Sequence, residues 1–397
     1  MHILALNTGS SSLKFAVYDV GCAQPDGLVP LRYGAIERIG GAGSRVRIGS
    51  QGETDAVAIP IHDQTAALEW LTADLGREQL WEQLSAIGHR IVHGGSAYRR
   101  PVRITRSVRA ALEALVPLAP VHLPEELHTI DVMARIAPDL PQIACFDTAF
   151  HRELPLEARW YGIPRALAGD GVVRYGFHGL SYEYVVRDLR AQGALGARTI
   201  VAHLGNGASM AAVRDGRSID TSMGFTPIGG FMMGTRSGDL DPGILLYLLR
   251  QRSLHIDEVS AMVTESGGLL GLSGTSSDMR DLLTRSTTDH RAAEAVAVFC
   301  YQARKFLGAY VAALCGLDTL VFTGGIGENS PEIRARICDA LDCLGIRIDT
   351  VRNEANASTI SAAGAPVNVH VIRTNEELMI ALHTARVLES ETGEDHD

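Results

Sequence analysis

The sequence predicts an α/β protein of two domains, each built on a mixed β-sheet flanked by helices. At 397 residues, the chain is longer than one ordinary hydrophobic core supports. Its first third opens with strands and then alternates helices and strands, an order typical of a mixed sheet covered by helices. Both halves also begin with a strand, a glycine-rich turn and a returning strand, which indicates a weak internal repeat.

The first half should form the first sheet and its helices. Its expected strands are 3–7, 13–19, 33–38, 45–49, 86–92 and 142–146. Its expected helices are 64–75, 108–115 and 125–136. The small residues 9–12 between the first two strands let backbone N–H groups and hydroxyls approach an anion closely. This turn therefore predicts a phosphate-binding hairpin.

Lys14 lies at the rim of that hairpin. Among the 36 basic residues of the chain, only Lys14 and Lys305 are lysines. A compact ammonium group that pivots onto phosphate oxygens is one reason to keep a lysine at this point. The alternative is that this lysine is present by chance, because short motifs often match by accident.

The second half repeats the pattern after residue 150. Its expected strands are 199–204, 209–213, 217–221, 319–322 and 367–372. Its expected helices are 242–250, 257–264, 277–283, 290–315, 331–344 and 376–388. The residues 205–207 predict a tight turn, and Asp215-Gly216 is a hairpin signal. The acidic tail 390–397 is expected to be frayed.

Composition excludes several classes of protein. The net charge of −10, without a basic run, argues against nucleic acid or an anionic membrane as a partner. The six cysteines, of which Cys22 is the first, are scattered along the sequence, and no two of them have the Cys-x-x-Cys spacing. Charged residues interrupt the apolar stretch 292–317, which predicts a buried helix and no membrane span. Because the first residues lead directly into a strand, we expect no signal peptide and a cytoplasmic location.

A third glycine-rich segment, 322–330 (FTGGIGENS), follows an apolar strand and precedes a helix that starts at Pro331. A turn of this kind lets a nucleotide approach the backbone closely. It lacks the Gly-x-Gly-x-x-Gly spacing of a dinucleotide site, and the chain has no Walker-type phosphate loop. The segment therefore predicts a nucleotide-binding turn of another kind.

Nine segments, in family order, resemble the acetate kinase family of the sugar kinase, heat-shock chaperone and actin superfamily. They are 7–19 (NTGSSSLKFAVYD), 89–95 (HRIVHGG), 146–151 (FDTAFH), 175–179 (YGFHG), 203–207 (HLGNG), 224–241 (GFTPIGGFMMGTRSGDLD), 276–281 (SSDMRD), 322–330 and 374–378 (TNEEL). The resemblance covers essentially the whole chain. It implies two duplicated actin-like (ribonuclease H-like) domains with an active-site cleft between them. The first would comprise 1–148 plus 377–397, and the second, which would also form a homodimer, 150–376.

The implied reaction is reversible phosphoryl transfer from ATP to acetate, giving ADP and acetyl phosphate, with Mg²⁺ or Mn²⁺ as cofactor. A carboxylate is already ionised at neutral pH, so it needs no general base to attack in line. The obstacle is repulsion between two anions. Positioning and electrostatic neutralisation should therefore supply most of the catalysis.

The resemblance assigns four catalytic residues. Arg90 would bind the substrate carboxylate or the phosphoryl group, and Arg236 would reach the transferring phosphoryl group. His178 would donate a hydrogen bond to its oxygens, and Asp147 would lie near Mg²⁺ and Arg236. Taken singly, the arginines could be surface charges, the histidine a structural residue and the aspartate a cap of the following turn.

Further site residues follow from the same resemblance. Mg²⁺ would lie near Asn7 and Glu376, with Glu377 hard to separate from its neighbour, and most of its ligands would be water and phosphate oxygens. The nucleotide-binding residues would be Ser12, Lys14, His203, Asn206, Gly207, Asp278, Met279, Arg280, Gly325, Ile326 and Asn329. The substrate-binding residues would be Arg90, Val92, Val121, His122, Phe177 and Pro227. Val92, and not a smaller residue, favours acetate over propionate as the substrate. A pocket built for one methyl group nevertheless discriminates only weakly against one extra methylene.

The chain departs from the family pattern at two positions. Tyr182 stands where the family commonly has a second histidine, and Gly229 where it usually has glutamate before Arg236. We expect altered packing and loop stiffness from these changes, and no loss of catalysis. Two alternatives to an acetate kinase stay open: a propionate or butyrate kinase, and a non-catalytic ATP-binding sensor.

Overall fold

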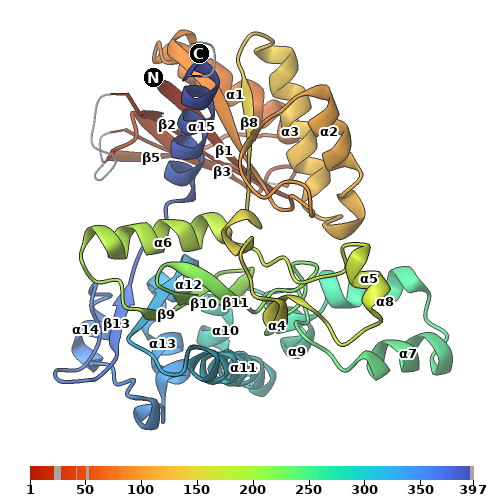
Figure 1. The fold of residues 1–397 in the computed structure, drawn as a ribbon, viewed down its shortest axis with the longest axis vertical. Coiled ribbons are helices and arrows are strands. Elements are labelled where there is room, and N and C mark those ends of the chain that lie inside the picture. Colours follow the sequence, from red (N-terminus) through yellow and green to blue (C-terminus); the bar gives the residue numbers. More distant parts are fainter. Residues whose placement is uncertain (22–27, 42, 51–52, 394–397) are drawn as a thin grey trace. The chain divides into compact units, whose positions relative to one another are not determined.

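The structure, a computed structural model, describes residues 1–21, 28–41, 43–50 and 53–393. The chain divides into two compact units. The first unit comprises Met1–Ala149, Gly179–Tyr184 and Asn375–Asp397, and the second comprises Phe150–His178 and Val185–Thr374. Each is a mixed sheet flanked by helices, which confirms the predicted α/β class (Figure 1). Cys22 and the end of the tail, residues 394–397, lie outside the described residues.

The sheet of the first unit has the strand order β5-β4-β3-β2-β1-β6-β8-β7. The bounds are β1 His2–Gly9, β2 Ser12–Asp19, β3 Arg32–Glu37, β4 Arg45–Ser50, β5 Glu53–Ala58, β6 Leu84–Ile91, β7 Val102–Arg103 and β8 Gln142–Phe146. The predicted hairpin is confirmed, since β1 and β2 are antiparallel with Gly9 opposite Ser12. β1 pairs in parallel with β6, and β6 with β8, so these three strands end at the same edge.

Helices cover both faces of this sheet, and alternation along β1 explains why. The helices are α1 Gln64–Arg77, α2 Arg106–Glu113, α3 Leu123–Ile136 and α15 Glu376–Gly393. Leu4 and Leu6 pack in one cluster with residues of α1 and α3. Ile3 and Ala5 pack in another cluster with α15. The period of two along a strand therefore places α15 and the α1–α3 pair on opposite faces.

The sheet of the second unit has the order β11-β10-β9-β12-β13. The bounds are β9 Arg198–Leu204, β10 Ala208–Arg214, β11 Arg217–Thr221, β12 Thr319–Thr323 and β13 Asn368–Val371. β9 and β10 form an antiparallel hairpin, and β9 pairs in parallel with β12. This pairing repeats that of β1 with β2 and β6, so each unit adds a parallel strand to the first strand of its hairpin.

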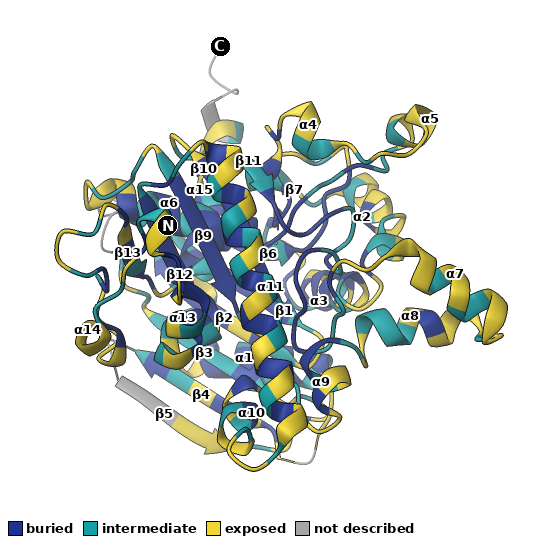
Figure 2. Cartoon of the chain, turned by 90° about the horizontal axis from the view of Figure 1, so that it is seen from below, coloured by how far each residue is buried: buried dark blue, intermediate teal, exposed yellow. Residues whose placement is uncertain are grey.

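The remaining helices follow in the second half of the chain. They are α4 Leu156–Arg159, α5 Arg165–Gly169, α6 Gly179–Ala191, α7 Pro242–Gln251, α8 Ile256–Thr264, α9 Gly268–Ser273, α10 Met279–Arg285, α11 His290–Leu314, α12 Gly324–Asn329, α13 Pro331–Cys338 and α14 Thr350–Glu354. Buried and exposed residues alternate along α11, one face of which packs on the sheet (Figure 2). No helix in the described ranges combines the length and apolarity that crossing a membrane requires.

Two predicted elements were wrong. The helix expected at 331–344 ends at Cys338, because Asp339 is extended and Ala340 has a φ of 58°. A separate 3₁₀ turn, Asp342–Leu344, follows it. The turn expected at 324–330 is mostly the short helix α12. The helix α6 and the strand β5 were not predicted from the sequence.

Candidate active site

Polar side chains of the first unit meet where β1, β6 and β8 end. Arg90 lies near the end of β6, and Asp147 directly follows β8. Arg90 donates hydrogen bonds to Oδ2 of Asp147 from Nε at 3.0 Å and from Nη2 at 2.6 Å. Nη1 of Arg90 donates to Oδ1 of Asn7 at 3.4 Å. Nδ2 of Asn7 in turn donates to Glu376 at 2.9 Å and to Glu377 at 3.0 Å, at the start of α15.

These five residues, Asn7, Arg90, Asp147, Glu376 and Glu377, form what we call the arginine–carboxylate cluster. Burial opposes the charge of Arg90, but the carboxylates of Asp147 and Glu376 outweigh burial and raise the pKa of Arg90. Three carboxylates accompany one guanidinium, so negative charge is in excess. Such an excess, together with the amide oxygen of Asn7, suits a hard divalent cation such as Mg²⁺.

The cluster does not enclose a metal by itself. Within the described residues, no three His, Cys, Asp or Glu side chains converge closely enough to hold a metal ion. A bound Mg²⁺ would therefore take most of its ligands from water and phosphate oxygens. Glu376 and Glu377 both accept a hydrogen bond from Asn7, so the structure brings both to the cluster.

A second group of polar residues lies in the second unit, around the β9–β10 hairpin. His178 precedes α6 in the left-handed backbone region, at a φ of 58°. Its Nδ1 lies 2.8 Å from Oγ of Ser209, and its ring stacks on His203 with centroids 4.2 Å apart. Ser209 and His203 are opposite each other on β10 and β9. The β-hairpin thus positions the imidazole of His178 from one side.

Arg236 also lies beside this hairpin, at Gly207. Its Nη1 donates to the carbonyl of Pro227 at 2.6 Å. A Cβ at Gly207 would lie 2.7 Å from Nη2 of Arg236 and 3.4 Å from Nε2 of His178. The missing side chain of Gly207 therefore lets the guanidinium and the imidazole approach one point. We call His178, His203, Gly207, Ser209 and Arg236 the histidine–arginine cluster.

Replacing Gly207 by alanine should lower kcat at least roughly tenfold, because the methyl group would displace the guanidinium of Arg236, which we expect to reach the transferring phosphoryl group. The fold should be retained, since a flexible side chain can yield. Gly308→Ala is the matched control, because Gly308 lies in α11 and a Cβ there meets nothing within 4 Å. Steady-state kinetics and thermal unfolding of both variants test this. Unchanged kcat in Gly207→Ala would show that the close approach is irrelevant to turnover.

The helix α12 begins beside this cluster. A Cβ at Gly324 would lie 3.1 Å from Nε2 of His203. The N–H groups of Gly324 and Thr374 donate to Oε1 of Glu328 at 3.0 and 3.1 Å. Arg334, whose side chain is fully buried, donates to the carbonyls of Gly327 and Glu328 and to Asn353. Arg334 supports the end of α12, and no sequence motif indicated this role.

The other predicted nucleotide residues lie on three elements. Gly325, Ile326 and Asn329 belong to α12. Asp278 caps α10 by accepting from the N–H of Arg280 at 2.8 Å, and it also pairs with the Arg280 guanidinium at 3.1 Å. Asn206 lies in the β9–β10 turn, and its carbonyl accepts from the N–H of Gly234 at 2.9 Å. Ser12 and Lys14 belong instead to the hairpin of the first unit, where Lys14 is opposite Asn7.

The predicted substrate residues also fall in both units. In the first unit, Val92 is buried directly after β6, Val121 is exposed, and His122 is the N-cap residue of α3. In the second unit, Phe177 and Pro227 are buried. Each unit thus carries part of the predicted set. The exposed Val121 is the least suited of these residues to lining an apolar pocket.

A family model described as the acetokinase family matches residues 2–382. The chain belongs to the acetokinase family. It is therefore an enzyme, a kinase that transfers a phosphoryl group to a carboxyl group.

Individual acetokinases are similar over nearly the full length. An acetate kinase of Rhodopseudomonas palustris is 44% identical, over 97% of this chain and 98% of that relative. A solved propionate kinase of Francisella tularensis has a TM-score of 0.88 at 38% identity, over 96% of this chain and 98% of that one. A solved acetate kinase of Porphyromonas gingivalis has a TM-score of 0.84 at 37% identity, over 98% and 99%. The resemblance stated from the sequence is thus confirmed.

The two departures from the acetokinase pattern have local consequences. Tyr182 is fully buried in α6. At Gly229, a Cβ would lie 3.3 Å from Oδ1 of Asp239, which accepts from the N–H of Gly230 at 2.7 Å. Asp239 therefore braces this loop at the point where a glutamate was expected.

Glu126, which sequence reasoning missed, lies in the first turn of α3, and its Oε2 accepts from the N–H of Val92 at 2.9 Å.

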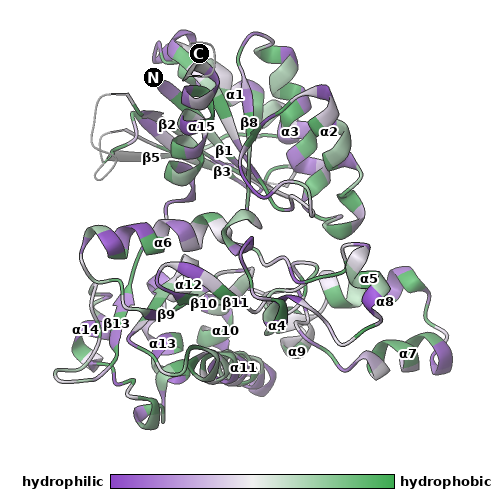
Figure 3. Ribbon diagram, in the orientation of Figure 1, coloured by the Kyte–Doolittle hydropathy of each residue, from purple (hydrophilic) through white to green (hydrophobic). Residues whose placement is uncertain are grey.

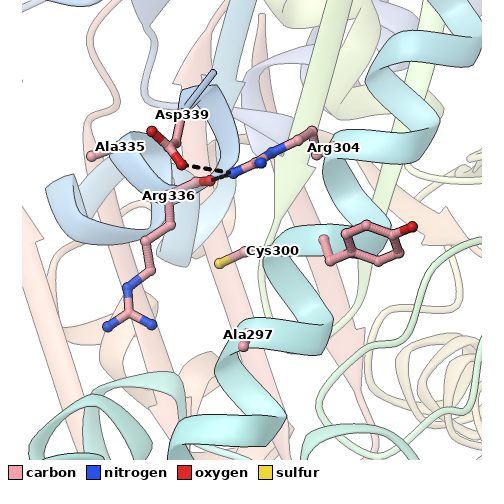
Figure 4. A pocket seen from close by; sticks show the side chains of 7 residues that line it. Ala297, Cys300, Arg304, Ala335, Arg336 and Asp339 are labelled. Carbon is pink, nitrogen blue, oxygen red and sulfur yellow. Dashed lines mark hydrogen bonds and ion pairs between the residues drawn. The ribbon is translucent and has the colours of Figure 1, made fainter. Parts of the chain in front are cut away.

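One pocket of this acetokinase lies between α11 and α13 and contains no predicted site residue. It measures about 520 Å³ and is lined by Ala297, Cys300, Tyr301, Arg304, Ala335, Arg336 and Asp339 (Figure 4). The guanidinium of Arg304 donates to the carbonyls of Arg336 and Ile337 and pairs with Asp339 at 3.6 Å. Burial raises the pKa of the Cys300 thiol to about 11. The pocket therefore presents neither an uncommitted Arg304 nor a reactive thiolate.

Proposed function

We propose that the protein transfers the γ-phosphoryl group of ATP to acetate, reversibly, giving acetyl phosphate and ADP. The observation that carries this proposal is the placement of Arg90 and Arg236. Each guanidinium is held by hydrogen bonds to groups of this chain, Arg90 by Asp147 and Arg236 by the carbonyl of Pro227. Preorganised cations are what two mutually repelling anions require.

In this proposal each cluster has its own task. Arg90 neutralises the carboxylate of acetate, and Asp147 holds the guanidinium in place. Arg236 and Nε2 of His178 donate to the oxygens of the phosphoryl group as it moves from ADP to the carboxylate.

Mg²⁺ or Mn²⁺, when bound with ATP, would neutralise charge on the β- and γ-phosphates. Asn7 and Glu376 would hold its water shell, and Glu377 would share that task. For the nucleotide, we propose contacts from the β9–β10 turn, the start of α10 and the start of α12, with Ser12 and Lys14 reaching phosphate oxygens. Glycine backbone suits phosphate groups because a residue without a side chain lets an anion approach its N–H group closely.

We propose acetate over propionate because Val92 is buried two residues after Arg90. The similarity to a propionate kinase keeps the larger acid as the second candidate. Replacing Val92 by alanine should raise kcat/KM for propionate relative to acetate by about tenfold, since one methylene is worth roughly 1–3 kcal/mol. Leu75→Ala is the control, because it removes buried volume from α1 in a hydrophobic cluster to which Val92 does not belong. If Val92→Ala leaves the ratio of kcat/KM for propionate to that for acetate unchanged, Val92 does not line the acceptor pocket.

Acetyl phosphate formation tests the function itself. Purified protein with ATP, Mg²⁺ and acetate should give a hydroxamate-reactive acyl phosphate in equal amount to ADP. Comparing kcat/KM for acetate, propionate and butyrate tests the substrate. A preference for butyrate would reject acetate as the main substrate, and nucleotide binding without any acyl phosphate would favour the sensor alternative.

We further propose a homodimer formed through the second unit, in the cytoplasm. The helix α7 supports the dimer, because it has no buried residue although Ile244, Leu246 and Tyr247 are apolar or aromatic. Figure 3 shows hydrophobic residues along α7 and α8. An exposed apolar patch on this scale is typical of a surface that associates. Sedimentation of the purified protein as a monomer would contradict this proposal.

A further inference from the structure

A buried acid holds the segment that carries both Arg90 and Val92. Glu126 lies in the first turn of α3, and its side chain is only 1% exposed. Its Oε2 accepts from the N–H of Val92 at 2.9 Å. Its Oε1 is buried and, within the described residues, has no hydrogen-bond partner. One carboxyl group therefore fixes the backbone directly after β6.

The surroundings of Glu126 do not neutralise it by direct contact. In the described part of the chain, no basic side chain forms an ion pair with it within 4.0 Å. The charged groups that face it are Arg90 of β6 and Asp147 after β8. His89 of β6 is buried, which lowers its pKa to about 4 and keeps it neutral. The guanidinium of Arg90 is already engaged by Asp147.

The other helices that pack on α3 bring their polar groups to different residues of it. From α2, Arg109 pairs with Asp131 at 2.8 Å. From α1, Thr65 bonds to His128 at 2.9 Å. His122, the N-cap residue, belongs to the same helix as Glu126. Burial raises the pKa of Glu126 to about 8, against the attraction of Arg90 and the hydrogen bond from Val92.

We propose that Glu126 is a positioning residue for the acceptor site: its protonated form fixes the Val92 backbone, and its ionisation weakens acetate binding beside Arg90. This inference rests on the proposed function. In the neutral form, the carbonyl oxygen accepts from Val92 without adding charge. In the ionised form, a further negative charge lies near a guanidinium that Asp147 already balances, so a second carboxylate is repelled.

The pH dependence of KM for acetate in Glu126→Gln tests this. Wild-type KM should rise by roughly fivefold or more between pH 7 and pH 9, because the added charge acts at short range in a poorly solvated site. Glutamine keeps an acceptor for Val92 but cannot ionise, so its KM should stay nearly constant. Glu125→Gln is the matched control, since Glu125 lies in the same helical turn and should follow the wild type. Values of kcat should change little in Glu125→Gln.

A thermal measurement gives an independent readout. The folded state keeps the proton of Glu126 up to about pH 8, whereas the unfolded state loses it near pH 4.5. Wild-type stability should therefore fall between these values relative to Glu126→Gln, and the difference in Tm should widen from pH 5 to pH 8. A Tm difference that stays constant from pH 5 to pH 8 would contradict the proposal that Glu126 is a buried neutral acid.

The outcomes separate the inference from the function on which it rests. If Glu126→Gln and the wild type share the same KM profile while both make acetyl phosphate, only the inference fails. If the wild type makes no acetyl phosphate at any pH, the proposed function fails and the inference fails with it. A rising wild-type KM, a flat Glu126→Gln profile and a widening Tm difference together support the role of Glu126.

Discussion

Replacing Arg236 by alanine should lower kcat by about 10³-fold, as expected when a cation that stabilises the transferring phosphoryl group is lost. The KM values should change far less, because this charge matters most when negative charge shifts in the transition state. Thermal unfolding should hardly change, since Arg236 is only partly buried. Rapid-quench and steady-state measurements of acetyl phosphate check the result.

Two comparisons make this test specific. Arg236→Lys keeps the positive charge but loses the planar fork, so it should recover only part of the rate. Arg217→Ala is the matched control, because the Arg217 side chain is 77% exposed in the same unit and has no proposed role. A kcat for Arg236→Ala within twofold of the wild-type value would contradict the proposal that Arg236 stabilises the transferring phosphoryl group.

Replacing Arg90 by alanine is expected to damage both activity and stability. The carboxylate of Asp147 is fully inaccessible to solvent, and Arg90 supplies its nearest positive charge. Removing one partner of a buried ion pair lowers the free energy of unfolding by about 3–5 kcal/mol. The kcat/KM for acetate should fall by about 10²-fold or more, because the variant lacks the guanidinium that we propose binds the acceptor carboxylate.

A double variant separates these two effects. Asp147→Asn in the Arg90→Ala background removes the uncompensated charge, so it should restore much of the lost stability without restoring activity. Chemical denaturation and kinetics of both single variants and the double variant provide the cycle. If Arg90→Ala unfolds at the same denaturant concentration as the wild type, the pair is not a buried structural unit.

The sequence predicted the hairpins well because their signals are local. Apolar runs that are almost continuously buried form β1 and β2, and the small residues between them specify a two-residue connection. The β9–β10 hairpin has the same kind of buried strands around the turn 205–207. Family resemblance added the site residues, and the structure gathers Asn7, Arg90, Asp147 and Glu376 although they are far apart in sequence. Only the fold brings the ends of three parallel strands and the start of α15 together.

The elements that were missed depend on tertiary contacts. Three glycines in 324–327 disfavour a helix by about 1 kcal/mol each, which made a turn the natural prediction. The hydrogen bond from Gly324 to Glu328 and the donors of Arg334 at the other end offset that cost. The helix α6 was missed because His178 starts it from a left-handed conformation without a side-chain cap. Glu126 was missed because burial of an acid leaves no mark on the sequence.

Stereochemistry at phosphorus distinguishes direct transfer from transfer through the enzyme. In the proposed function, the carboxylate of acetate attacks the γ-phosphorus of ATP itself, and the two clusters only neutralise and position the reactants. A single in-line displacement inverts the configuration, so chirally labelled ATP should give acetyl phosphate of inverted configuration. Retention would require two successive displacements through a phosphorylated enzyme, and that result would contradict direct transfer.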